Sequence, residues 1–133
     1  MTHRKLARKL LLKAEQDIIV IEKLKSDPEI GTEILGFHAQ QAAEKMLKAV
    51  LAYHQIRFPF THRLTELIDS LKDSGLDFPQ ELEEVRYLTP FAVEFRYTIF
   101  AEEENEIFDT EATLSLLNSL RQWLIEVIDL EDE

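Results

Sequence analysis

The chain has 133 residues, 45% of them hydrophobic, which is enough for one compact domain spanning residues 1–133 and hardly for two. It has no cysteine, which excludes disulfides, thiolate metal sites and cysteine nucleophiles. There is no run of 18 or more uncharged apolar residues, and Lys and Arg interrupt the leucines near the N-terminus. We therefore predict no membrane span, no signal peptide and a cytoplasmic location.

The net charge of −11 is unevenly distributed along the chain. Residues 1–66 hold 11 Lys/Arg and 8 Asp/Glu, whereas residues 67–133 hold 4 and 18. The densest basic cluster comprises Arg4, Lys5, Arg8, Lys9 and Lys13. The overall acidity argues against coating of nucleic acid by the whole surface. The basic cluster is either a solvated helix face or a contact for an acidic partner or RNA, and the charge split favours self-association.

The first half of the chain contains three helical patterns. Apolar residues recur every three or four positions and predict a helix over about residues 4–25. A second helix is predicted from Thr32, a suitable N-cap, to a point before Pro59. A third is predicted to start with Thr61 as its N-cap and to close at "DSG".

The second half contains two more helical patterns. Pro79 suits the first position of a fourth helix, and Thr89-Pro90 should break or kink that helix. After the acidic stretch "AEEENEIFD", which we interpret as an exposed connection, a last helix is predicted over about residues 110–130. No segment alternates with a period of two between hairpin turns. We therefore predict an all-α bundle.

Several short motifs follow one another in this helical pattern. An "AQQAAEK" helix is followed by the helix start "TH-x-L" and, about thirty-five residues later, by an "RY" dipeptide before a long final helix. In this order and spacing the motifs resemble the HEPN (higher eukaryotes and prokaryotes nucleotide-binding) domain family over about residues 4–128. The resemblance implies an antiparallel four-helix bundle with an additional short helix, assembled as a two-fold homodimer. It also implies pairing with a minimal nucleotidyltransferase protein in a two-component or toxin–antitoxin system.

Other members of the family that the chain resembles are metal-independent ribonucleases. Their motif is an Arg, four to six residues of any type, and a His, and "RFPFTH" fits it with Arg57 and His62. In that role Arg57 would stabilise charge on the phosphorane and His62 would move a proton. The alternative is that His62 is a structural group in the first turn of the third helix and Arg57 is solvated.

Arg96 and Tyr97 lie in the otherwise apolar stretch "FAVEFRYTIF". A buried arginine needs an anionic partner, so Arg96 either forms an ion pair, for example with Glu94, or binds a nucleotide or RNA phosphate together with Tyr97. The four histidines show no metal-ligand spacing, and there is no glycine-rich phosphate loop, so we predict no metal and no cofactor.

Two functions follow from these observations. The first is a HEPN-like interaction module that pairs with a minimal nucleotidyltransferase and binds nucleotide, without appreciable turnover of its own. The second is a metal-independent ribonuclease that uses Arg57 and His62 and is restrained by that partner.

Overall fold

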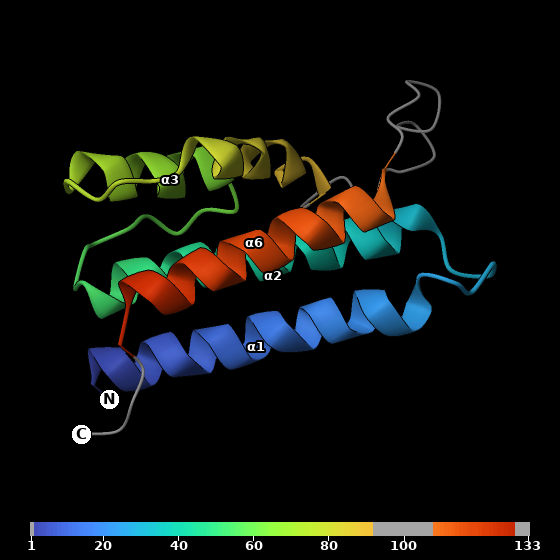
Figure 1. Ribbon diagram of the computed structural model, residues 1–133, viewed down its shortest axis with the longest axis horizontal. Helices are drawn as coiled ribbons and strands as arrows, with labels where there is room; N and C mark the ends of the chain where they lie inside the picture. Colours follow the sequence, from blue (N-terminus) through green and yellow to red (C-terminus); the bar gives the residue numbers. More distant parts are fainter. Residues whose placement is uncertain (1, 92–107, 130–133) are drawn as a thin grey trace.

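The computed structural model describes residues 2–91 and 108–129, and the regular elements there are helices (Figure 1). In chain order these are α1 (His3–Leu24), α2 (Thr32–Tyr53), α3 (Leu64–Asp73), the 3₁₀-helix η1 (Gln80–Leu88) and α6 (Thr110–Val127). No strand occurs in the two described ranges. The all-α prediction is therefore confirmed. Within the same ranges, no helix has both the length and the apolar character that a membrane span requires.

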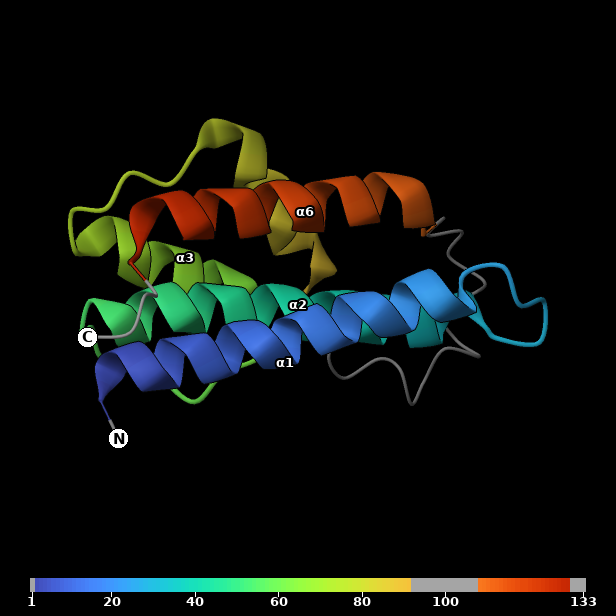
Figure 2. The ribbon, with the colours of Figure 1, turned by 60° about the horizontal axis from the view of Figure 1, so that its bottom comes forward.

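α2 is the central helix of the bundle. It contacts α1, α3, η1 and α6, and the two views show α1 on one side of it and α3 on another (Figures 1 and 2). Ala39, Ala42 and Ala43 of α2 are fully buried, as are Ala7 and Ala14 of α1. Such small side chains let two helix backbones approach closely. The alanines of α2 therefore serve packing inside this chain, and they are not available as a surface for a second copy.

α6 packs on α2 and runs antiparallel to α1. Lys25 Nζ, just after α1, lies 3.0 Å from Glu111 Oε1 at the start of α6. At the opposite end of the bundle, Arg4 Nη2 lies 3.8 Å from Asp129 Oδ2. Asp109 caps α6, because its carboxylate accepts a backbone N–H of the first turn at 2.9 Å. The predicted start of the last helix at residue 110 is confirmed, and its end lies three residues before the predicted one.

After α2 the chain reverses direction and runs back along that helix towards α3 (Figure 1). Gln55 adopts a left-handed conformation with φ 57°, and the backbone N–H of Ile56 donates to the carbonyl of Leu51 at 2.9 Å. This arrangement closes the last turn of the helix. The predicted end of the second helix before Pro59 is thus confirmed, and the segment 54–63 is left to connect α2 with α3.

The predicted start of the third helix is wrong. Thr61 does not cap it: α3 begins at Leu64, with Arg63 at the N-cap position. The Thr61 hydroxyl instead accepts the backbone N–H of Arg63 at 3.0 Å in a local turn. The backbone N–H of Leu64 donates to the Thr89 hydroxyl at 3.0 Å, from the residue after η1. His62 consequently lies before α3 and not in its first turn.

η1 differs from the α-helix that the sequence predicts after Pro79. Pro79 occupies the N-cap position with an extended backbone and not the first helical position. Leu82, Val85 and Leu88 are buried and recur every three residues. That interval matches the three residues per turn of a 3₁₀-helix. Arg96, Tyr97 and the acidic stretch around residues 102–106 lie outside the described residues.

Candidate functional site

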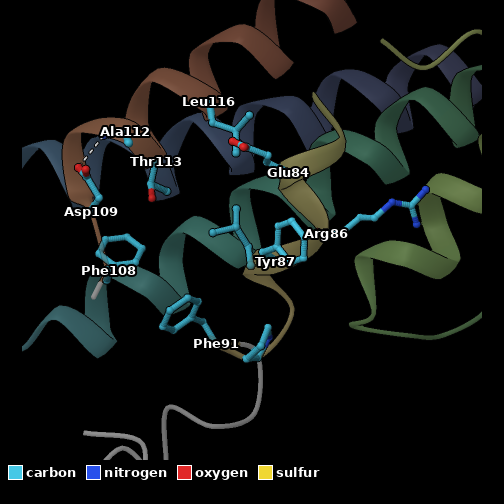
Figure 3. A pocket seen from close by; sticks show the side chains of 11 residues that line it. Glu84, Arg86, Tyr87, Phe91, Phe108, Asp109, Ala112, Thr113 and Leu116 are labelled. Atoms are coloured by element: carbon cyan, nitrogen blue, oxygen red, sulfur yellow. Dashed lines mark hydrogen bonds between the residues drawn. The ribbon is translucent and has the colours of Figure 1, made fainter. Parts of the chain in front are cut away.

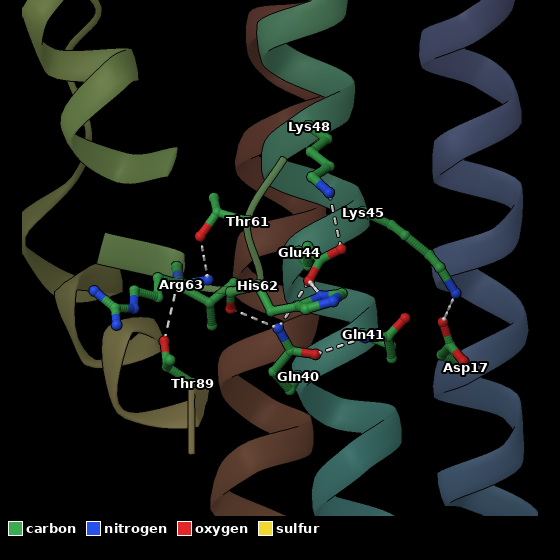
Figure 4. Close-up of polar contacts among 11 residues, drawn as sticks. Asp17, Gln40, Gln41, Glu44, Lys45, Lys48, Thr61, His62, Arg63 and Thr89 are labelled. Carbon is green, nitrogen blue, oxygen red and sulfur yellow. Dashed lines mark hydrogen bonds and ion pairs between the residues drawn. The ribbon is translucent and has the colours of Figure 1, made fainter. Parts of the chain in front are cut away.

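A row of polar side chains on α2 faces the segment that leads into α3 (Figure 4). Gln40, Glu44 and Lys48 follow one another at intervals of four residues and therefore share one side of the helix. Gln40 is 0% exposed and Glu44 is 5% exposed. Buried polar groups need hydrogen-bond partners, and His62 supplies one from the connecting segment. We call Gln40, Glu44, Lys48 and His62 the His62 network.

Gln40 uses both ends of its side-chain amide. Its Nε2 donates to Glu44 Oε1 at 3.0 Å and to the backbone carbonyl of His62 at 2.9 Å. Its Oε1 accepts a hydrogen bond from Gln41 Nε2 at 2.8 Å. Because both N–H groups of this fully buried amide are committed, Gln40 fixes where the backbone at His62 passes along α2.

Glu44 is an ionised carboxylate at neutral pH. Burial raises the pKa of Glu44, but hydrogen bonds from Gln40, His62 and Lys48 together outweigh burial and hold the pKa below its usual value. Lys48 Nζ lies 2.9 Å from Oε2, and His62 Nδ1 lies 2.8 Å from Oε1. A carboxylate has no proton to donate, so the hydrogen between Glu44 and His62 is carried by Nδ1.

The other side of the His62 ring is accessible to solvent. The side chain is 60% exposed although its Nδ1 is bound to a buried carboxylate. With Nδ1 protonated, a neutral imidazole has Nε2 as its acceptor. A ring held in this way can take up a proton at Nε2 and return it.

A second histidine–carboxylate pair lies between α1 and α2. Asp17 is 7% exposed, and its carboxylate lies 2.6 Å from Lys45 Nζ and 2.8 Å from His38 Nδ1. The His38 side chain is 26% exposed, less than half the exposure of His62. All three groups belong to α1 and α2, so this cluster joins the two helices.

No hydrogen bond joins the side chains of Arg57 and His62 in the structure. Arg57 is exposed, and its side chain forms no hydrogen bond or ion pair with the residues that the structure describes. Arg63, next to His62, has a 76% exposed side chain that lies 3.9 Å from Glu66. Figure 4 shows the Arg63 side chain pointing away from the His62 ring. The predicted nucleotide or phosphate site at Arg96 and Tyr97 lies outside the described ranges.

Sequence reasoning missed Glu44, the residue that orients His62. The available signal was the spacing of Gln40, Glu44 and Lys48 on a helix whose other residues are mostly apolar. In residues 2–91 and 108–129 no group of three or more His, Cys, Asp or Glu side chains is arranged to hold a metal ion.

A pocket of about 560 Å³ lies between η1 and the start of α6 (Figure 3). Tyr87, Phe91 and Phe108 are among its lining residues. Arg86, a cation in its wall, is held by Glu83, with Nε 2.6 Å from the carboxylate. No histidine and no member of the His62 network lines this pocket, so it does not extend the candidate site.

Comparison with protein families shows that the model described as HEPN domain matches residues 7–128 of this chain. Comparison with curated proteins and with solved structures gave no significant match. The matched range covers nearly the whole chain and includes every member of the His62 network.

Proposed function

Because this chain belongs to the HEPN domain family, we propose that it is a metal-independent ribonuclease module whose proton-transfer group is His62. The observation that carries the proposal is the ring's position, with Nδ1 2.8 Å from the Glu44 carboxylate and the side chain 60% exposed. A general base needs one nitrogen held in a fixed orientation and the other accessible to the substrate. The His62 network supplies both conditions.

The proposed reaction is attack of a ribose 2′-hydroxyl on the adjacent phosphorus. The 2′-oxygen forms a bond to phosphorus while its proton passes to His62 Nε2, and the bond from phosphorus to the 5′-oxygen breaks. The departing 5′-oxygen takes up a proton. The products are a 2′,3′-cyclic phosphate and a 5′-hydroxyl end. Glu44 stays ionised and stabilises the imidazolium that forms.

A two-fold homodimer, the assembly that the resemblance implies, would supply the second proton-transfer group. In such a dimer the protonated His62 of a second copy donates to the departing 5′-oxygen. Arg57 has no partner among the described residues, so its guanidinium is available to offset charge on the phosphorane.

The proposal is tested by incubating the purified protein with single-stranded RNA in excess chelator. We expect cleavage that leaves cyclic phosphate ends. Arg57→Ala should slow this cleavage at least about a hundredfold, the effect of removing one charge-stabilising donor from other enzymes. Arg63→Ala is the control, because Arg63 adjoins His62 in the sequence but its side chain points away from the His62 ring and lies 3.9 Å from Glu66. Its rate should stay within a few-fold of wild type. The absence of cleavage in chelator would contradict the proposed activity.

A second function, pairing with a minimal nucleotidyltransferase in a toxin–antitoxin or two-component system, is favoured by the surface of α1. Lys5, Lys9 and Lys13 are exposed and follow one another at intervals of four residues, so they form one basic strip. Arg4 and Arg8 are less exposed and make contacts within the chain, so they are not part of this strip. A strip of this kind suits an acidic partner surface and mainly accelerates association.

Changing Lys5, Lys9 and Lys13 to Glu should slow association with a minimal nucleotidyltransferase from the same genome by about tenfold or more at low salt. The difference should diminish at 0.5 M salt, where the Debye length falls to only a few ångströms. Lys23→Glu, an exposed lysine near the far end of α1, is the control. Association rates can be followed by stopped-flow fluorescence. Equal rates for the triple variant and wild type at low salt would exclude the strip as a docking surface.

A further inference from the structure

A fully exposed aromatic ring lies two residues before His62. Phe60 has a relative exposure of 108% and stands at a bend in the segment 54–63. The neighbouring Phe58 is only partly exposed, and its ring centroid lies 5.9 Å from Lys48 Nζ. Single apolar side chains are common on protein surfaces and need no function. The surroundings of Phe60 therefore decide how its exposure is interpreted.

Phe60 lies in a segment, residues 54–63, that carries two arginines and no acidic residue. None of the chain's 26 acidic residues lies between Glu44 and Glu66. That stretch carries two histidines and four cations; Lys45 pairs with Asp17, Arg63 lies 3.9 Å from Glu66, and Arg57 has no ion pair with the described residues. Glu44 itself is buried, and Lys48 lies 2.9 Å from its carboxylate. In a chain with a net charge of −11, Arg57 is therefore the cation of this stretch that can pair with an anionic ligand.

An exposed ring with an arginine three residues away, unpaired within the described ranges, suits single-stranded nucleic acid, because a base stacks on the ring while the arginine contacts a phosphate. Pro59 restricts the backbone directly before Phe60, which lowers the entropy lost when the ring is immobilised. We propose that Phe60 is a stacking platform for one nucleobase of single-stranded RNA, beside the phosphate that His62 serves. This inference rests on the proposed function and adds that the substrate is unpaired at this position, since duplex RNA keeps its base faces covered.

The test is equilibrium binding of a short single-stranded oligoadenylate. Phe60→Ala should weaken binding roughly five- to 150-fold, the range for loss of one base–aromatic stack. Phe60→Leu keeps an apolar side chain without a π face and should weaken binding nearly as much, whereas Phe60→Trp should bind at least as tightly as wild type. Tyr87→Ala is the control, because Tyr87 is 77% exposed but lies beside acidic residues of η1. Wild-type affinity for Phe60→Leu, or a change below twofold for Phe60→Ala, would overturn the proposal.

A second probe separates the base from the phosphates. An oligonucleotide of the same length that lacks bases should bind wild type and Phe60→Ala equally, and a difference between them would contradict stacking. In Phe60→Trp with Trp123→Phe, which leaves one tryptophan in the chain, oligoadenylate should quench the emission.

Cleavage is measured separately, so the two proposals can fail independently. If wild type cleaves RNA and Phe60→Ala binds RNA as tightly as wild type, Phe60 is not a stacking platform, and the proposed ribonuclease activity is unaffected. RNA binding that depends on Phe60 without any cleavage refutes the ribonuclease alone. If Phe60→Ala alters only self-association or partner binding, Phe60 is a protein contact and the platform is overturned.

Discussion

Glu44→Ala is expected to lower the free energy of unfolding by about 2–4 kcal/mol. Glu44 accepts a hydrogen bond from Gln40 at 3.0 Å and pairs with Lys48 and His62. Gln40 is fully buried, so the substitution leaves one amide N–H without an acceptor, which by itself costs about 1–3 kcal/mol. Lys48, whose side chain is only 17% exposed, also loses its counter-charge. Urea denaturation at pH 7, followed by circular dichroism, measures the change.

Glu44→Gln is the control for this loss, because it keeps the volume and one oxygen that can accept from His62 Nδ1. It removes the charge and should cost only about 1 kcal/mol. The pKa of Glu44 is held below its ordinary value of 4.5 in the folded protein. The charge therefore stabilises the fold at pH values above 4.5, and this contribution is lost as the pH falls through the folded pKa. The difference in unfolding free energy between wild type and Glu44→Gln should therefore shrink as the pH falls below 4.5.

Two outcomes would contradict this account of Glu44. A loss below about 0.5 kcal/mol for Glu44→Ala at pH 7 would mean that the buried network contributes little to the fold. A difference between wild type and Glu44→Gln that does not change with pH would mean that the Glu44 charge is not linked to folding.

The long helices could be predicted because they follow local rules. α1 is displaced by one residue from its predicted range and α6 begins at the predicted residue. An apolar period near 3.6 accumulates over such long segments and is hard to mistake. The start of α3 could not be predicted, because the N–H of Leu64 is bound by Thr89, 25 residues later. The sequence around Thr61 gives no indication of that contact.

The site depends still more on contacts between distant residues. The spacing in "RFPFTH" indicated Arg57 and His62, but the group that fixes the His62 ring is Glu44, 18 residues earlier. Polar residues at three positions four apart on the mostly apolar α2, namely Gln40, Glu44 and Lys48, indicate that a partner exists. The identity of that partner is decided by the chain reversal at Gln55, which carries the connecting segment back along α2. Arg57, in contrast, fits the motif by its spacing, but no hydrogen bond joins it to His62 in the structure.

His62→Ala should reduce RNA cleavage by about 10²–10⁴-fold, the contribution of a positioned acid–base group. The structure offers His38→Ala as a closely matched control, because both histidines hold Nδ1 2.8 Å from a carboxylate. His38 differs in its place between α1 and α2 and in its lower exposure, so its loss should leave the cleavage rate within a few-fold of wild type. Rates are measured in excess chelator with enzyme in excess over labelled RNA.

Stability must be measured in parallel, because a folding defect would also abolish cleavage. Glu44 keeps Gln40 and Lys48 as partners when His62 is removed, so His62→Ala should cost no more than about 1–2 kcal/mol. A folded His62→Ala protein that cleaves as fast as wild type would remove His62 from the reaction. Equal loss in His38→Ala and His62→Ala would instead attribute the effect to packing around α2. Only loss confined to His62→Ala, in a protein that still unfolds cooperatively, supports proton transfer by the ring that Glu44 orients.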